Sequence, residues 1–160
     1  DEAIVDSEKA WRKNGLKKNN MEFKTAYPED LLAAGFGEGT IDVVYINNVM
    51  TLLYDQGEAL KEFYRVLKPG GLLICETILS DVERDDAVVD GARSIGNSIQ
   101  AGRTKEELLD LVKAAGFDGV EFIDAYPVEP ETGFKANRTV EVFPSNEKVS
   151  FEAVAMHAIK

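Results

Sequence analysis

The chain has 160 residues, 44% of them apolar and 29% charged, which are the proportions of one soluble globular domain spanning residues 1–160. Its 29 acidic and 18 basic residues give a formal net charge of −11, which argues against a nucleic-acid-binding or anionic-membrane surface. The single cysteine, Cys75, permits no intramolecular disulfide and no cysteine-cluster metal site, and no apolar run approaches the roughly 18 residues of a membrane span. We therefore expect a cytoplasmic protein without a metal.

The N-terminal part of the chain predicts a helix followed by a strand. Residues 1–14 are expected to form the helix, with Ile4 and Trp11 on one side. Gly15 is expected to end it, because glycine tolerates the backbone conformation that follows a helix. Residues 21–26 are expected to form the strand.

A glycine-rich segment, GFGEG at residues 35–39, follows a short helical turn predicted at residues 31–34. A glycine fingerprint for a nucleotide cofactor is meaningful only between a strand and a helix. Because this segment lies between a helical turn and a strand, we interpret it as a connecting loop.

Residues 42–78 form the block around which the rest of the chain is arranged. Residues 42–48 and 72–78 are strand-like runs that are apolar on both faces, and residues 56–67 between them have helical periodicity. Such strands belong to parallel sheets covered by helices, and a strand-helix-strand crossover makes the sheet parallel. The predicted fold class is therefore α/β.

The crossover helix has start and stop signals. Asp55 is expected to cap it, with Glu58 reaching back in a capping box. The KPGG sequence at residues 68–71 is expected to form a type II turn with Gly70 at positive φ. One stripe of the helix is expected to face the sheet: Ala59, Leu60, Phe63, Val66 and Leu67.

The chain after this block predicts two more helices. Residues 88–92 hint at the first, and residues 94–102 carry the small and amide residues typical of a segment that covers a site. Thr104 and Glu107 predict a second capping box, which opens a helix that Gly116 ends.

Three strands are expected near the C-terminus. Residues 119–125 alternate as one strand, and residues 126–137 are loop-like. Residues 139–143 and 149–159 are expected to pair as an antiparallel hairpin across the turn sequence at residues 144–147.

Two motifs in the central block carry a family resemblance: IDVVYINNV at residues 41–49 and RVLKPGG at residues 65–71. They resemble class I S-adenosylmethionine-dependent methyltransferases, most closely the branch with arsenite and quinone-biosynthesis methyltransferases. Residues 21–31 are similar to the family's third strand and following loop, and residues 114–117 to the helix end before its sixth strand. The resemblance implies a Rossmann-like sheet in the order 3-2-1-4-5-7-6, mostly parallel with an antiparallel C-terminal strand.

The resemblance also implies that this sheet lacks its first strands. The first strand, the cofactor's glycine loop and the second strand would precede residue 1, and residues 21–26 would pair only with that second strand. An unpaired edge exposes backbone N–H and C=O groups. We therefore expect one of three arrangements. Either preceding sequence completes the sheet, or a second copy of the chain completes it, or the N-terminal residues rearrange.

The expected site lies at the carboxyl ends of the strands, where open α/β sheets bind ligands. These ends are residues 26–30, 47–51 and 76–80. The resemblance implies S-adenosylmethionine as cofactor. It places Tyr27, Pro28 and Glu29 beside the adenine, and Asn47, Asn48 and Val49 beside the methionine moiety and the reacting methyl group.

Each of these candidates has a structural alternative. Asn47 and Asn48 can cap the strand end by bonding nearby backbone, although two amides that end an apolar strand are costly without partners. Glu29 and Asp30 can simply begin the helical turn. Glu76, in a buried run, is a general base or a paired structural acid, and the structural role is favoured.

Two other reactive side chains are expected to be structural. Cys75 is expected to fill the core and His157 to pack or to lie on the surface. Arsenite methyltransferases carry a metalloid-binding cysteine where this sequence has Asn48, and one cysteine cannot supply the set of thiolates. Arsenic is therefore a poor choice of substrate.

The resemblance implies methyl transfer to a small molecule by the intact protein. No catalytic residue is assigned, because an activated sulfonium donor needs alignment more than a strong catalyst. Residues 1–160 alone are expected to be inactive and to bind the cofactor weakly or not at all. The alternative is a non-catalytic, methyltransferase-like module that forms a homodimer through its exposed sheet edge. A dinucleotide-dependent oxidoreductase is less favoured, since no strand-GxGxxG-helix sequence occurs.

Overall fold

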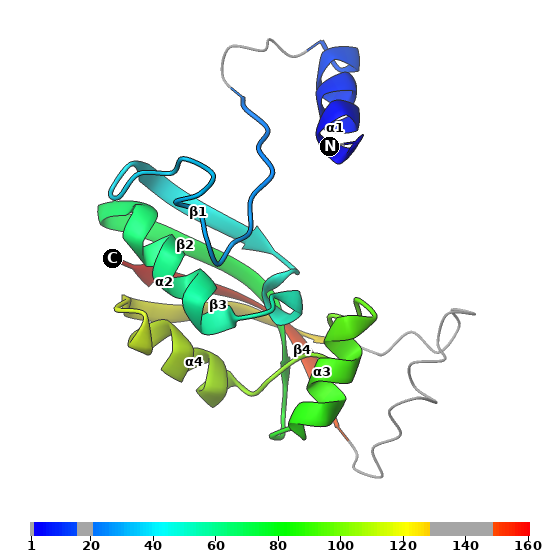
Figure 1. The fold of residues 1–160 in the computed structure, drawn as a ribbon. Coiled ribbons are helices and arrows are strands. Elements are labelled where there is room, and N and C mark those ends of the chain that lie inside the picture. Colours follow the sequence, from blue (N-terminus) through cyan, green and yellow to red (C-terminus); the bar gives the residue numbers. More distant parts are fainter. Residues whose placement is uncertain (1, 16–20, 129–148) are drawn as a thin grey trace.

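The computed structural model describes residues 2–15, 21–128 and 149–160. Figure 1 shows helices and strands alternating along most of this chain. The elements in chain order are α1 (Glu2–Lys13), β1 (Ile41–Asn47), the short 3-10 helix η2 (Met50–Leu52), α2 (Gln56–Val66), β2 (Leu67–Ser80), α3 (Asp86–Ser94), α4 (Lys105–Ala114), β3 (Asp118–Val128) and β4 (Phe151–Ile159).

The described strands form a four-stranded sheet in the order β1-β2-β4-β3. β1 and β2 are parallel, and β4 runs antiparallel to both of its neighbours, so β1, β2 and β3 point the same way and only β4 is reversed. This confirms the α/β class and the antiparallel C-terminal strand. The order also equals the last four positions, 4-5-7-6, of the expected sheet.

The crossover helix α2 forms much as predicted, with one difference at its start. Asp55 caps it by accepting a hydrogen bond from the backbone N–H of Glu58 at 2.9 Å. The N–H of Asp55 itself donates to Glu29 at 3.1 Å, so an acid distant in sequence takes the place expected for the Glu58 carboxylate. All five residues of the predicted stripe are buried: Ala59, Leu60, Phe63, Val66 and Leu67.

The KPGG segment at residues 68–71 is part of β2, whereas the sequence predicts a turn before the strand. The pairing with β1 shifts between Ile41, opposite Leu67, and Val43, opposite Leu72, so the extra residues form an irregularity within the strand. Gly70 does adopt the predicted positive φ, at 75°. Its N–H donates to the carbonyl of Lys160, which ties this bend to the C-terminus.

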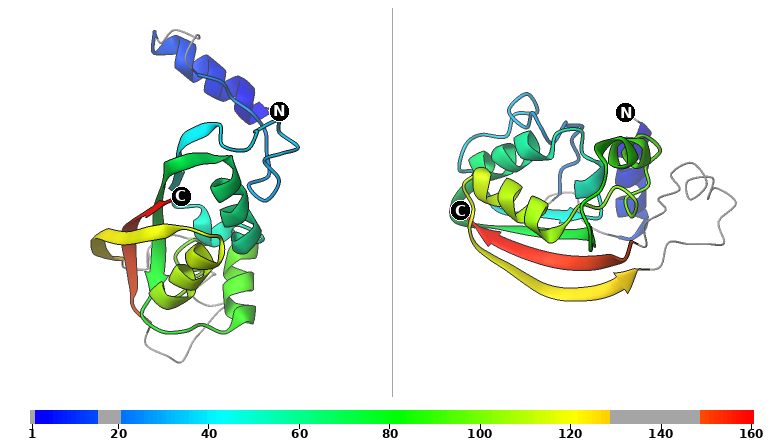
Figure 2. Two further views of the ribbon diagram at one scale, coloured as in Figure 1. Left: turned by 90° about the vertical axis from the view of Figure 1, so that its left-hand side faces the viewer. Right: turned by 90° about the horizontal axis from the view of Figure 1, so that it is seen from below.

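The hydrophobic core lies between the sheet and the helices α2 and α4. Figure 2 shows these helices on one face of the sheet, and no described helix covers the opposite face. We call that opposite face the open face. Strand residues alternate accordingly, with the following buried toward the helices: Ile46, Leu73, Cys75, Val154, Met156 and Ala158.

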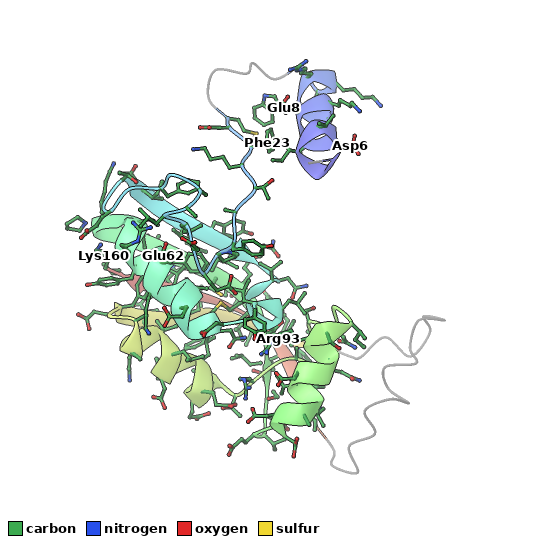
Figure 3. The ribbon with its side chains drawn as sticks, in the orientation of Figure 1. Asp6, Glu8, Phe23, Glu62, Arg93 and Lys160 are labelled. Atoms are coloured by element: carbon green, nitrogen blue, oxygen red, sulfur yellow. The ribbon has the colours of Figure 1, made fainter. Side chains whose placement is uncertain are left out.

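The N-terminal helix is confirmed as α1, and Gly15 follows it at φ 72°. Residues 21–26, however, are not a strand, which corrects the sequence prediction. Within the described chain no strand lies beside them to supply a ladder of hydrogen bonds, and extended backbone alone does not make a sheet. Met21 and Phe23 instead share a small hollow with Trp11 of α1. Figure 3 shows Phe23 beside that helix.

The C-terminal half confirms both helices and both capping signals. Thr104 and Glu107 form the complete capping box at α4, and Gly116 follows that helix at φ 105°. Residues 94–102 form turns, and the carbonyl of Ser98 accepts a hydrogen bond from the Thr51 hydroxyl at 3.1 Å.

The last strands differ in part from the predicted hairpin. β3 continues through residues 126–128, which the sequence assigns to a loop, and β4 pairs with both β2 and β3. The predicted strand at residues 139–143 and most of the predicted loop lie outside the described residues. No helix in the described part of the chain is long and apolar enough to span a membrane.

Candidate active site

A cleft of about 400 Å³ lies at the carboxyl ends of β1 and β2, on the open face. It contains two of the predicted cofactor residues and Glu76, the β2 acid opposite the last residue of β1. Its lining residues are Asn47, Asn48, Glu76, Thr77, Ile78, Asp124, Tyr126, Ala153, Val154 and Ala155. We call it the strand-end cleft.

Strand register explains why these residues meet. Asn47 pairs with Glu76, Glu76 with Ala155, and Ala155 with Asp124, which gives one row across all four strands. The next row joins Ile78, Ala153 and Tyr126. Because side chains two residues apart point to the same face, both rows face the same side of the sheet.

Three polar side chains form a hydrogen-bonded chain at the edge of the strand-end cleft. The Tyr45 hydroxyl donates to Glu76 Oε2 at 3.0 Å, and Asn47 Nδ2 donates to the Tyr45 hydroxyl oxygen at 2.9 Å. Glu76 is therefore a paired acid, as its structural interpretation requires. Within the described part of the chain only one of its two carboxylate oxygens is hydrogen-bonded, so Glu76 can still accept a hydrogen bond from a ligand.

The backbone of Asn48 ends the pairing of β1 with β2. It lies at φ 53°, the left-handed region that asparagine tolerates better than most residues, and its N–H donates to the Glu76 carbonyl at 2.8 Å. The side chain of Asn48 lines the strand-end cleft.

The other predicted cofactor residues lie outside this cleft. Tyr27 begins a tight turn to Asp30 and is 79% exposed, and Glu29 in that turn accepts the bond from Asp55 at the start of α2. Val49, 46% exposed, precedes η2. Of the six residues, Asn47 and Asn48 thus line the strand-end cleft, Tyr27, Pro28 and Glu29 lie in a turn docked on the N-terminus of α2, and Val49 lies in neither.

Two side chains of α2 hold the loop that follows this turn. Glu62 accepts hydrogen bonds from the backbone N–H groups of Leu31 and Leu32, and Arg65 donates to the carbonyl of Phe36. The hydrogen bond from Arg65 to Glu62 lowers the pKa of the Glu62 carboxyl. The glycine segment at residues 35–39 is a loop between this turn and β1, as predicted.

The comparisons with known proteins agree with the fold. Residues 4–75 match the family described as a methyltransferase domain. An arsenite methyltransferase of Aquipseudomonas alcaligenes is 30% identical over 113 residues, which cover 68% of this chain and 32% of that protein. A solved structure, an arsenic (III) S-adenosylmethionine methyltransferase from Chlamydomonas reinhardtii, superimposes with a TM-score of 0.75 over 94% of this chain and 48% of that one, at 24% identity.

These matches indicate a class I S-adenosylmethionine-dependent methyltransferase domain. A ubiquinone biosynthesis O-methyltransferase of Cereibacter sphaeroides is also similar, at 31% identity over 63% of this chain and 42% of that protein. The chain therefore spans between about a third and two fifths of the length of these relatives.

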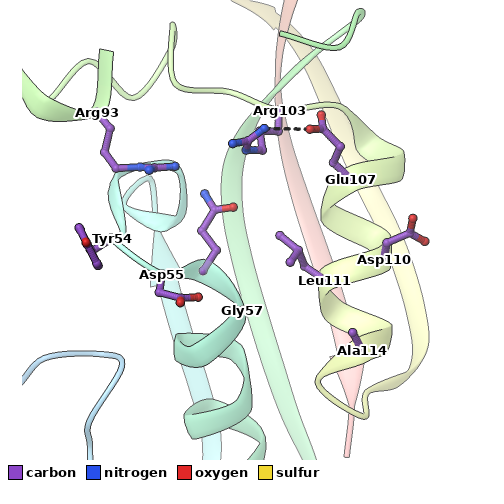
Figure 4. Close-up of a pocket in the computed structure, with 10 residues that line it drawn as sticks. Tyr54, Asp55, Gly57, Arg93, Arg103, Glu107, Asp110, Leu111 and Ala114 are labelled. Atoms are coloured by element: carbon purple, nitrogen blue, oxygen red, sulfur yellow. Dashed lines mark hydrogen bonds and ion pairs between the residues drawn. The ribbon is translucent and has the colours of Figure 1, made fainter. Parts of the chain in front are cut away.

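A second cleft of this methyltransferase domain lies on the helical face, between the start of α2 and α4 (Figure 4). It is larger, at about 590 Å³, and two arginines line it. Arg103 is bonded to Glu107 and Asp86, and Arg93 to Asp90 and the Thr51 carbonyl. Because each guanidinium already has acidic partners, this cleft offers little free positive charge to a ligand.

The remaining reactive side chains of the methyltransferase domain lie away from the strand-end cleft. Cys75 is buried in the core as predicted, and burial raises the pKa of its thiol to about 12, so it is not a nucleophile near neutral pH. His157 faces the open face opposite Ile74 and Glu121 and does not line the cleft. Within the described residues no group of acids, histidine and cysteine could hold a metal ion.

Sequence reasoning missed three contributors to this cleft: Asp124, Tyr126 and the alanines of β4. Asp124 falls in the predicted strand and Tyr126 in the predicted loop, and neither assignment says which strand lies opposite. Asp124 pairs with Ala155 and Tyr126 with Ala153 of β4, and only the tertiary structure shows this pairing.

Proposed function

We propose that the protein containing this chain transfers a methyl group from S-adenosylmethionine to a small-molecule acceptor bound in the strand-end cleft. The observation that carries the proposal is the pair Asn47-Glu76, at which the pairing of the two parallel strands ends and which lines a cleft of ligand size. The match to the methyltransferase family supports the reaction type.

The proposed cofactor residues are those named from the sequence. Tyr27, Pro28 and Glu29 would border the adenine, and the 79% exposed ring of Tyr27 is free to stack on it. Asn47, Asn48 and Val49 would lie along the methionine moiety and the reacting methyl group. When bound, the cofactor supplies a methyl group already activated by a sulfonium, so these residues need only bind and orient it.

Arsenite is not the proposed acceptor, although relatives carry that name. A thiophilic acceptor needs thiolates. The one cysteine of the chain, Cys75, is buried, and burial raises the pKa of its thiol to about 12. An organic acceptor with nitrogen, oxygen or carbon as nucleophile fits the amide and carboxylate lining better.

The experiment is a calorimetric titration of S-adenosylmethionine into the full product of the gene and into the 160-residue chain. Micromolar binding by the full product is expected, because family members act through this cofactor. Its absence would overturn the proposed function. We further propose that residues 1–160 alone bind weakly and are inactive, and micromolar binding by this chain would contradict that point.

A second candidate function is a non-catalytic module that dimerises through the edge of β1. In the described chain no strand pairs with the outer edge of β1, and Val43 and Tyr45 are 48% and 55% exposed. Light scattering, which measures the oligomeric state, tests whether the protein dimerises. A dimer that Val43→Lys dissociates, together with no cofactor binding by the full product, would favour this function over catalysis.

A further inference from the structure

We infer that the strand-end cleft takes its methyl acceptor as a cationic amine, and that Glu76 both binds the ammonium group and receives its proton. This inference rests on the proposed methyl transfer and names the acceptor class for the same site. It is carried by the charges, the register and the hydrogen bonds of the cleft.

Two carboxylates face each other across a floor of small side chains. Glu76 on β2 and Asp124 on β3 both pair with Ala155 of the strand between them. Their backbones are thus two strand spacings apart, about 9.5 Å. Ala153, one row further, extends the floor, so the methyl side chains leave room for a small group between the acids.

Among the described residues, no basic side chain pairs with the acids of this cleft. None of the described residues that line it is basic. The side chain of Asp124 is exposed, and in the described part of the chain it makes no hydrogen bond or ion pair. Two unneutralised carboxylates attract a cation and repel an anionic acceptor.

Glu76 is held in position for this role. The bond from Tyr45 to Oε2, with Asn47 bonded to Tyr45 in turn, fixes the orientation of the carboxylate. Its second oxygen, Oε1, has no hydrogen bond among the described residues. An ammonium can therefore donate to Oε1 without breaking an existing bond, and no reorientation of the side chain is needed.

An aromatic ring completes the recognition of an amine. Tyr126 lines the same cleft, two residues beyond Asp124, and is 62% exposed. Tyrosine rings attract ammonium groups that lie over their faces. The cleft therefore combines two anions and one aromatic ring, which suits an organic amine better than a neutral alcohol.

The chemical step balances with these groups. An N–H proton of the bound ammonium passes to the Glu76 carboxylate, which frees the nitrogen lone pair. The lone pair forms the new N–C bond as the C–S bond breaks and its electron pair goes to sulfur. The product is a methylated ammonium, and Glu76 returns its proton to water.

The test measures binding of matched probes to the full gene product by calorimetry: 2-phenylethylamine, 2-phenylethanol and 3-phenylpropanoate. The amine should bind about tenfold more tightly than the alcohol, and the carboxylate most weakly, because a charge-assisted hydrogen bond is worth about one to two powers of ten in affinity. S-adenosylhomocysteine is titrated into the same protein as a separate test of the proposed function.

Variants locate the effect. Glu76→Gln and Asp124→Asn should each lower the amine affinity about tenfold and leave the affinity for the alcohol unchanged. Glu121→Gln is the matched control, since it removes the same charge from β3 outside the cleft. The side chain of Asp124 is exposed and unbonded among the described residues, so the Asp124 variant should fold even if the Glu76 variant does not.

Equal affinities for the three probes, or an equal loss in Glu121→Gln, would overturn the inference. If S-adenosylhomocysteine binds while the probes show no preference, the acceptor class is wrong and methyl transfer stands. If S-adenosylhomocysteine does not bind, the proposed function itself fails.

Discussion

The carboxylate of Glu29 accepts a hydrogen bond from the backbone N–H of Asp55, 26 residues further along the chain, at 3.1 Å. Asp55 is the N-cap of α2, and its side chain accepts a hydrogen bond from the backbone N–H of Glu58. The bond thus joins a proposed cofactor turn to the helix that packs on the sheet. Any movement of this turn is coupled to the start of α2.

Glu29→Ala is therefore expected to destabilise the chain by about 1 kcal/mol, the usual net value of such a hydrogen bond. Urea denaturation measures the loss. Glu29→Gln keeps an acceptor oxygen and should lose less than half as much. Equal losses in both variants would show that charge, and not the hydrogen bond, is what the site requires.

Acid should loosen the loop that Glu62 holds. The bond with Arg65 lowers the pKa of Glu62, so its contribution to stability is present above the unfolded value of 4.5 and is lost as pH falls through the lower folded value. In Glu62→Gln this component of acid destabilisation should be absent. Thermal melting of both proteins between pH 6 and about 3 tests this, and parallel curves would contradict it.

Thr104→Ala should cost about 1 kcal/mol, because it removes one half of the capping box that starts α4. Thr104→Ser retains the hydroxyl that accepts from the N–H of Glu107 and should be nearly neutral. Denaturant midpoints compare the two variants. If serine proved as destabilising as alanine, the lost methyl group and not the cap would be responsible.

Alkaline pH should weaken the fold through Cys75. Burial raises the pKa of its thiol from 9.0 to about 12, so the unfolded chain releases this proton first. The stabilising contribution is complete below pH 9 and declines by about 1.4 kcal/mol per pH unit above it until the folded value is reached. Urea denaturation at successive pH values, with Cys75→Ala as comparison, measures the difference in slope.

The same burial protects the thiol from reagents. Labelling of Cys75 by a maleimide at pH 8 should be slow in the folded chain and rapid in urea, because reagent and thiolate both need an opened core. Rapid labelling of the folded protein would show that the strand carrying Cys75 is not packed as the structure has it.

The helix starts and the bend at Gly70 could be predicted from nearby residues. Asp55 and Thr104 start their helices as predicted, and Gly70 has the predicted positive φ. These features depend on residues within three or four positions of each other, where hydrogen-bonding geometry leaves few alternatives. The prediction for residues 21–26 was wrong, since a strand depends on a partner that local sequence does not supply.

By itself the sequence determined the α/β class, the helix boundaries and the acids and amides at the strand ends, because periodicity, capping and turn chemistry act over short distances. Only the tertiary structure decided that Tyr45 bonds Glu76, and that Glu76 faces Asp124 across Ala155. Those relationships depend on the register of strands far apart in the chain. A shift of one residue in any strand would turn its side chains to the other face of the sheet and remove the cleft.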